Sequence, residues 1–389
     1  MLTSPLVMVI FGATGDLMHR KLMPALYHLI KEGALSRDIF IVGVGRREIT
    51  TDQFRELMAR SVRDSNPKEF DQPLWEHVIA RMHYQQGKFE DKEPYDELVQ
   101  LLQTFDDECR ACIPRFFYLA TPPMHYENIL THLHASKLSE GCGQGTTLFT
   151  KVLIEKPFGK DLKTARRLDE LLGKIFEERQ IYRIDHYLGK ETLQNILSFR
   201  FANGIFEPTW NHEFIDHVQI TLAEDAGVGT RGEFYDGVGA LRDVVGNHML
   251  EMLALIAMDQ PRAFDAQSIR DEKVKVLKSL VYPGGSALAI RGQYAGYIKE
   301  PNVDPKSTTE TFVALKLMLD TKRWRGVPFY LRTGKKLPRK VTEISILYKK
   351  PAVCRMDPKD PSSQVCLFPE PDVMRNVLAI RVEPDEGIA

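Results

Sequence analysis

Apolar runs alternate with amphipathic segments through the first half of the chain. Residues 6–11 are continuously apolar and stop at Gly12, after which apolar residues recur at helical spacing up to Leu29. Further strands are predicted at 39–45, at 116–123 together with a turn, and in the run that ends at Pro157. Further helices are predicted at 51–63, from residue 125 onward and at 161–179. Strands that alternate with helices predict βαβ units and a parallel sheet.

The pattern changes after about residue 200. Segments with period-two alternation then follow one another: HVQITLAED, SALAIRGQY, ETFVALKLML, VPFYLRT, EISILYK and NVLAIRVEP. One long helix is predicted over Tyr235–Met258. We therefore predict an α/β domain over residues 1–185, followed over 186–389 by an α+β domain with a large, mostly antiparallel sheet.

Composition limits the possible partners. The chain has 389 residues, enough for two domains, and its 52 Lys and Arg balance 53 Asp and Glu. No overall field would attract nucleic acid or an anionic membrane, so any anion must be recognised locally. The N-terminus lacks the basic segment of a signal peptide, and no apolar run reaches the length of a membrane span. We expect a cytoplasmic protein that binds neither nucleic acid nor membrane.

Five cysteines are scattered over the chain. Their odd number does not predict a disulfide framework, and it fits a reducing cytoplasm. Cys109 and Cys112 form one CxxC, but no second CxxC or nearby His pair completes a zinc site. We therefore interpret this pair as structural and expect no metal.

A glycine-rich turn follows the first predicted strand and opens the first helix; it comprises Gly12, Ala13, Thr14, Gly15, Asp16 and Leu17. Glycines at this point let a pyrophosphate approach the backbone and the positive helix N-terminus. A tight βα turn without a ligand has the same signature. In an alternating α/β region, the turn predicts a Rossmann-type dinucleotide-binding domain.

The second predicted strand ends before two arginines. NAD-binding proteins normally carry an acid there that accepts the ribose 2′-hydroxyl, whereas this chain has Arg46 and Arg47 after Gly45. Cations suit a 2′-phosphate, so we predict NADP, with NAD as the weaker alternative. Arg46 is the expected contact because it stands nearest the strand end. The alternative is that both arginines are solvated.

The segment RIDHYLGKE, residues 183–191, combines several polar groups at a predicted turn. His186, Tyr187 and Lys190 offer a ring, a phenol and an ammonium that could hold a phosphate dianion. Asp185 could orient a histidine from elsewhere, as carboxylates do for general bases, or could simply cap the following helix.

Other candidates are weaker when taken singly. His248 lies beside Asp243 and Asn247 on the predicted long helix, but nothing in the periodicity selects it among 11 histidines. Lys156, in EKPFG, ends a predicted parallel strand, where ligands of open α/β sheets bind, and the next residue, Pro157, could permit a cis bond. A basic cluster follows a strand and could be a solvated loop; it consists of Lys335, Lys336, Arg339 and Lys340.

Taken together, these motifs resemble the glucose-6-phosphate dehydrogenase family. The shared segments occur in the family's order: GATGDL, EKPFG, RIDHYLGKE, IFEPTWN, IDHVQIT, RGEFYDGVGALRD, NH, STTETF and PFYLRTGK. RIDHYLGKE is highly specific to the family, whereas GATGDL alone is not.

The resemblance implies roles for individual residues. Cofactor contacts are implied for the turn from Gly12 to His19, Arg46, Tyr118 and Ala120, and Lys156 is implied near both nicotinamide and sugar. Substrate contacts are implied for His186, Tyr187 and Lys190 at the phosphate, and for Glu224, Asp243, Lys335 and Lys340. His248 matches the general base, and Asp185 matches the carboxylate that orients it.

The implied reaction is oxidation of glucose 6-phosphate to 6-phosphoglucono-lactone with hydride transfer to NADP, the entry step of the pentose phosphate pathway, without a metal. Family members form homodimers or homotetramers and continue beyond the position of Ala389. For the chain as printed, that difference predicts an exposed sheet edge and weaker dimerisation. Gly246 and Glu383 stand where the family usually has Gln. Gly246 adds helix flexibility beside the base, and Glu383 adds a negative charge near a ligand-binding region.

Two other functions fit parts of the sequence. A sugar oxidoreductase of the glucose–fructose oxidoreductase type would explain EKP but not RIDHYLGKE. A catalytically silent NADP-binding regulator would need no general base, and the presence of both His248 and Asp185 argues against it.

Overall fold

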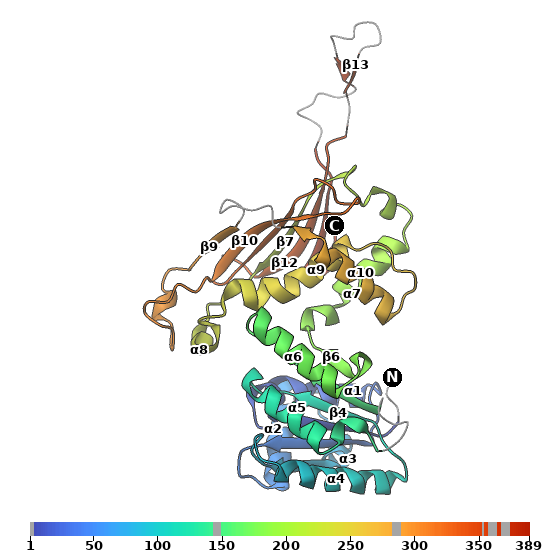
Figure 1. Cartoon of the computed structure of the whole chain (residues 1–389), viewed down its shortest axis with the longest axis vertical. Helices are drawn as coiled ribbons and strands as arrows, with labels where there is room; N and C mark the ends of the chain where they lie inside the picture. Colours follow the sequence, from blue (N-terminus) through green and yellow to red (C-terminus); the bar gives the residue numbers. More distant parts are fainter. Residues whose placement is uncertain (1–3, 143–148, 282–288, 352–353, 357–363, 367–373) are drawn as a thin grey trace. The chain divides into compact units, whose positions relative to one another are not determined.

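The computed structural model describes residues 4–142, 149–281, 289–351, 354–356, 364–366 and 374–389 (Figure 1). The chain divides into two compact units, Met1–Ile184 and Asp185–Ala389. Each unit has its own hydrophobic core. None of the described helices combines the length and the apolar character that crossing a membrane requires.

The first unit contains a six-stranded parallel sheet in the order β3-β2-β1-β4-β5-β6. Its strands are β1 (Leu6–Phe11), β2 (Ile39–Gly45), β3 (Met82–Gln86), β4 (Arg115–Leu119), β5 (Thr150–Ile154) and β6 (Ile181–Arg183). Its α-helices are α1 (Met23–Lys31), α2 (Thr51–Ser65), α3 (Gln72–Ala80), α4 (Glu93–Cys109), α5 (Tyr126–Ala135) and α6 (Leu162–Ile175). This strand order is that of the Rossmann fold, as predicted.

The first strand is apolar throughout because helices cover both faces of the sheet. Val7, Val9 and Phe11 belong to a core cluster that includes side chains of α4 and α5, whereas Leu6 and Ile10 belong to a second cluster with side chains of α1 and α2. A strand buried on both faces is continuously apolar instead of alternating.

Local capping fixes where two of these helices begin. The Thr50 hydroxyl accepts a hydrogen bond from the Gln53 amide at 3.2 Å, and the Gln53 side chain accepts one from the Thr50 amide at 2.9 Å. Asp161 and Thr164 form the same reciprocal arrangement before α6. Each of these capping boxes satisfies amides that the helix backbone leaves unpaired, so α2 and α6 have defined starts.

The second unit contains a mixed, mostly antiparallel sheet in the order β16-β15-β12-β7-β11-β10-β8, with β9 paired to β10. The strands are β7 (Ile215–Ala223), β8 (Leu280–Val281), β9 (Ala289–Gly292), β10 (Phe312–Leu319), β11 (Phe329–Gly334), β12 (Val341–Tyr348), β15 (Val377–Glu383) and β16 (Gly387–Ile388), with a separate pair, β13 (Cys354–Met356) and β14 (Gln364–Cys366). The α-helices are α7 (Glu191–Phe201), α8 (Gly232–Tyr235), α9 (Leu250–Ala257) and α10 (Ala266–Lys278). The β7–β11 pair is parallel. Of the predicted strand SALAIRGQY, residues 286–288 lie outside the described residues.

Alternation along β7 separates the two faces of this sheet. Val218, Ile220 and Leu222 join the core that α7 and α9 also supply, and the intervening Gln219 is exposed. Figure 1 shows α9 and α10 running along the sheet. The large antiparallel sheet predicted from period-two alternation is therefore confirmed.

The prediction of one helix over Tyr235–Met258 is wrong. The chain forms α8, a turn, a π-helix over Leu241–Met249 and then α9. Gly237 and Gly239 in the turn have φ angles of +83° and +75°. α8 ends where Asp236 becomes extended, and the two left-handed residues then form the turn before the π-helix. Glycine adopts such conformations without a steric penalty.

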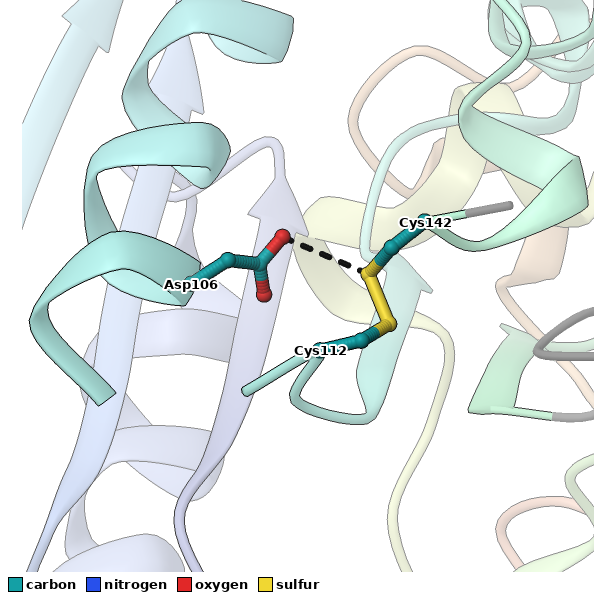
Figure 2. A group of neighbouring side chains, drawn as sticks. All are labelled: Asp106, Cys112 and Cys142. Atoms are coloured by element: carbon teal, nitrogen blue, oxygen red, sulfur yellow. Dashed lines mark hydrogen bonds between the residues drawn. A yellow bond between two sulfur atoms is a disulfide. The ribbon is translucent and has the colours of Figure 1, made fainter. Parts of the chain in front are cut away.

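The expectation of no disulfide framework is also wrong. Cys112 and Cys142 are disulfide-bonded with their Cα atoms 5.8 Å apart, and Figure 2 shows Asp106 beside the bond. Cys366 is disulfide-bonded as well, and Cys109 is a free thiol. The bond joins positions 30 residues apart in sequence, and spacing alone could not show that the fold brings them together.

Candidate active site

A cavity of about 470 Å³ lies at the carboxyl ends of β1, β2 and β4 in the first unit. Its lining consists of Gly12, Thr14, Gly15, Gly45, Arg46, Arg47, Phe89, Ala120, Thr121, Pro122 and His125. The strand order reverses between β1 and β4, and open α/β sheets bind their ligands at this reversal. The position and the glycine-rich turn fit a dinucleotide.

Gly12 is required by two features of this turn. Its φ is +85°, and a Cβ atom at this position would lie 2.6 Å from the carbonyl oxygen of Ala120. The Gly12 amide donates to the Val44 carbonyl at 2.8 Å, which ties the turn to β2. Any side chain would therefore move the turn away from the neighbouring strand ends.

Both arginines after β2 border the cavity, and Arg47 is also anchored because its carbonyl accepts a hydrogen bond from the Tyr84 hydroxyl at 2.8 Å. The other residues expected at the cofactor lie outside the lining: Ala13, Asp16, Leu17, Met18, His19, Tyr118 and Lys156. The sequence did not identify Phe89, Thr121, Pro122 or His125, because they come from loops that reach the cavity only through the sheet order.

Lys156 lies just beyond β5, and its bond to Pro157 is cis. The preceding Glu155 accepts a hydrogen bond from the Tyr118 hydroxyl at 2.6 Å, and its carbonyl accepts one from Tyr126 at 3.0 Å. Burial, reinforced by Glu155, raises the pKa of Tyr118. Tyr118 thus positions the segment that carries Lys156.

In the second unit, Asp185 and His248 form a close pair. Nδ1 of His248 lies 2.5 Å from Oδ1 of Asp185, and the histidine is 3% exposed. The same carboxylate oxygen accepts a hydrogen bond from the Tyr187 amide at 3.0 Å, so Asp185 also caps the short helix that follows. Burial opposes ionisation of Asp185, but His248, the Tyr187 amide and His186 together lower its pKa. Asp185 therefore both contacts a histidine and caps a helix, which the sequence analysis had given as alternatives.

The π-helix presents His248 to this carboxylate. The Asn247 side chain donates to the Asp243 carbonyl at 3.0 Å and accepts from the His248 amide at 2.6 Å, which inserts a side chain into the backbone ladder. π-Helical turns occur frequently at functional sites. Gly246 lies in the same turn, where a Cβ atom would meet its nearest neighbour at 3.6 Å, so a side chain would fit.

Two aromatic rings surround the imidazole. The ring centroids of His186 and Tyr187 lie 4.8 Å and 4.5 Å from that of His248. The Tyr187 hydroxyl lies 3.4 Å from Oγ1 of Thr342 on β12. Burial raises the pKa of Tyr187 to about 12, so it stays a neutral phenol.

Strand ends bring charged side chains to the same place. Because β7 and β11 are parallel and β12 and β15 are antiparallel neighbours, one end of the sheet carries Glu224, Lys335, Lys340 and Glu383. Lys335 pairs with Glu224 at 2.5 Å, Lys340 pairs with Glu383 at 2.9 Å, and Lys190 contacts Glu383 as well. Within the basic cluster, Lys335 and Lys340 therefore form ion pairs, whereas Lys336 and Arg339 are exposed.

Asp243 and Tyr235 complete this group. Burial raises the pKa of Tyr235, and the nearby carboxylates of Asp243 and Glu224 add to the effect. The Lys335 ammonium lies 5.2 Å from the centre of the Tyr235 ring. Sequence reasoning missed Tyr235 and Thr342 because neither residue type in its local context carries a distinctive signal.

Asp185, His186 and His248 could also share a cation. Asp185, His186 and His248 each offer one donor, and these atoms lie within 4.8 Å of one another. Proton transfer fits the group better, because Nδ1 of His248 already engages the Asp185 carboxylate. That hydrogen bond leaves Nε2 as the basic nitrogen of the neutral ring.

Comparison with known proteins identifies the family. The family model for the glucose-6-phosphate dehydrogenase NAD binding domain matches residues 9–195, and the model for the C-terminal domain matches residues 197–389. Glucose-6-phosphate 1-dehydrogenase of Chlamydia muridarum is 44% identical over 99% of the chain and 76% of its own length. Glucose-6-phosphate 1-dehydrogenase 2 of Mycobacterium bovis is 41% identical over the whole chain and 75% of its own length.

Solved structures agree with the sequence matches. A glucose-6-phosphate dehydrogenase in complex with its substrate glucose-6-phosphate has a TM-score of 0.86 and 34% identity, covering 98% of this chain and 76% of that one. The glucose-6-phosphate 1-dehydrogenase of Mycobacterium avium has a TM-score of 0.83 and 35% identity, covering 98% and 79%. The chain belongs to the glucose-6-phosphate dehydrogenase family.

Proposed function

We propose that the chain oxidises glucose 6-phosphate at C1 to 6-phosphoglucono-lactone, with NADP as the hydride acceptor. Family membership and the Asp185–His248 pair support this proposal. A bound dinucleotide supplies the acceptor for the hydride. The residues of the second unit then have to hold the sugar phosphate and remove one proton.

His248 removes that proton. With Nδ1 engaged by Asp185, Nε2 takes the proton of the anomeric hydroxyl as the C1–H bond breaks with its electron pair and the C1–O double bond forms. Asp185 is ionised because its pKa is lowered, and its negative charge stabilises the imidazolium. The proton and the hydride together account for the two-electron oxidation.

The remaining residues bind the substrate. We assign the phosphate to His186, Tyr187 and Lys190, and further sugar contacts to Glu224, Asp243, Lys335, Lys340 and Lys156. The proximity of the first three to the Asp185–His248 pair supports the assignment. Fixed contacts matter because a misplacement of about 1 Å can lower the rate roughly a hundredfold.

Substitution of His248 tests the proposal. His248→Ala should lower turnover by about 10²–10⁴-fold and leave substrate binding nearly unchanged. Reduction of NADP followed by absorbance would give the rate, and calorimetry would give the binding constant. Unchanged turnover would show that His248 is not the general base. Equal rates with glucose and glucose 6-phosphate would contradict the assigned phosphate site.

NADP rather than NAD is proposed because Arg46 and Arg47 border the cavity where an NAD protein would carry an acid. Arg46→Ala should raise the KM for NADP about tenfold and leave the KM for NAD unchanged, since one charge-assisted hydrogen bond is lost. Arg60→Ala is the matched control because Arg60 forms an exposed pair with Glu56 on α2.

We also propose that the reaction needs no metal, so dialysis against EDTA should leave turnover unchanged. Turnover that is lost on chelation and restored by a divalent cation would instead indicate a cation held by Asp185, His186 and His248.

Self-association as a homodimer or homotetramer is proposed from the family resemblance, and sedimentation velocity would test it.

A further inference from the structure

One carboxylate bridges two lysines beside the candidate sugar site. Oε1 of Glu383 contacts Nζ of Lys190, and Oε2 lies 2.9 Å from Nζ of Lys340. Together the two ammonium groups and the single carboxylate carry only one positive charge in excess. Burial opposes ionisation of Glu383, but the two lysines lower its pKa, so the carboxylate is charged at neutral pH.

This bridge is close to the Asp185–His248 pair. Nζ of Lys190 lies 5.4 Å from the centre of the Tyr187 ring, whose centroid is 4.5 Å from that of His248. The side chains of Glu383 and Lys190 are only 20% and 19% exposed. Solvent and salt therefore screen the charge of Glu383 less than they would at an open surface.

Lys335, at the same end of the sheet, also has a carboxylate partner. Lys335 pairs with Glu224 at 2.5 Å. Lys190, Lys335 and Lys340 thus each have a carboxylate partner within the chain. An incoming anion meets lysines whose charge is already partly neutralised.

We propose that Glu383 is a specificity-determining residue, an internal anion that competes with the substrate phosphate for Lys190 and Lys340 and so lowers discrimination between glucose 6-phosphate and glucose. The inference rests on the proposed function, because it assigns these lysines to the phosphate end of the sugar. A phosphate dianion must displace the Glu383 carboxylate or lie beside it, and both cost binding free energy. A neutral hydroxymethyl group leaves the bridge intact.

Glu383→Gln tests the proposal because it removes the charge and keeps the shape. The KM for glucose 6-phosphate should fall at least about tenfold, equivalent to about 1.4 kcal/mol, with kcat/KM for glucose within about twofold of the unsubstituted chain. Glu383→Met, which also lacks the charge, should shift the preference in the same direction. Glu386→Gln is the matched control: Glu386 lies three residues further on and accepts a hydrogen bond from Thr192 at 2.5 Å, so its loss should change neither constant.

Binding of inorganic phosphate gives a second measurement that needs no turnover. Titration calorimetry should show at least about tenfold tighter binding of inorganic phosphate to the Glu383→Gln chain than to the unsubstituted chain. Equal or weaker binding, or an unchanged or higher KM, would overturn the proposal and leave Glu383 as a residue that only positions the lysines. If no variant oxidises glucose 6-phosphate, the proposed function fails, and the phosphate titration still decides the role of Glu383.

Discussion

The two units build their candidate anion sites differently. In the first unit, glycines at the end of β1 leave room at the backbone, and the two arginines follow the next strand directly. In the second unit, side chains from separate strand ends and a π-helix supply the charges, and most of these charges already have partners. A backbone site depends on local conformation, whereas a side-chain site depends on register across a sheet.

The largest effect is expected where the second unit depends on one side-chain contact. Asp185→Asn should lower turnover by about 10³–10⁴-fold, because an amide neither fixes the His248 tautomer nor stabilises the imidazolium. Initial rates of NADP reduction would measure it. Asp216→Asn provides the control, since Asp216 forms a similar 2.6 Å contact with His217 at the start of β7, and this variant should keep full turnover. Equal losses in both variants would contradict the comparison.

The Cys112–Cys142 bond should stabilise the first unit alone. Its 30-residue separation corresponds to about 3.5 kcal/mol of loop-closure entropy, which the double substitution to serine would remove. Urea unfolding followed separately for each unit would show the loss, and Cys109→Ser, which alters only a free thiol, would serve as the control. A loss confined to the second unit would be inconsistent with the bond described here.

A somewhat smaller effect should follow from a change in the backbone site. Gly12→Ala places a Cβ atom 2.6 Å from the Ala120 carbonyl oxygen, so the turn must move and dinucleotide affinity should fall about a hundredfold. Gly33→Ala is the control, because Gly33 also has a positive φ but has open space around its Cβ position. That variant should lose only about 1–2 kcal/mol of stability and keep its affinity. Fluorescence titration with NADPH measures both affinities.

The smallest expected effect is a pH dependence of stability in the second unit. The pKa of Asp185 is lowered by folding, so its contribution is fully present above the ordinary value of 3.8 and is lost as pH falls through the lower folded value. Unfolding free energies of the unsubstituted chain and Asp185→Asn should therefore begin to converge as pH falls below about 3.8, and they should meet only below the folded pKa of Asp185. A difference that grows on acidification would mean that the pKa of Asp185 is raised.

The same contrast explains what could be predicted from sequence. The turn at Gly12 and the strand ending at Gly45 are local patterns, and the parallel sheet follows from their alternation with helices. RIDHYLGKE placed Asp185 and Lys190 in one segment, but no local pattern connects that segment with His248. The resemblance supplied that connection.

Features that depend on distant contacts escaped prediction. The left-handed Gly237 and Gly239 divide a segment whose apolar spacing indicates one helix. Glu383 was noted only as an unusual charge, because its bridge to Lys190 and Lys340 requires the β12–β15 register and the position of α7. Cys142 comes from a loop whose partner cannot be read from spacing.

The π-helix over Leu241–Met249 has a consequence for insertions and deletions. A π-turn differs from an α-turn by one added residue, and one residue corresponds to about 100° of rotation around an α-helix. Removing a residue between Leu241 and Asn247 would convert the turn to α-helix and rotate His248 away from Asp185, even if every side chain in the site were retained. The number of residues in this segment is therefore as much a part of the active site as their identity.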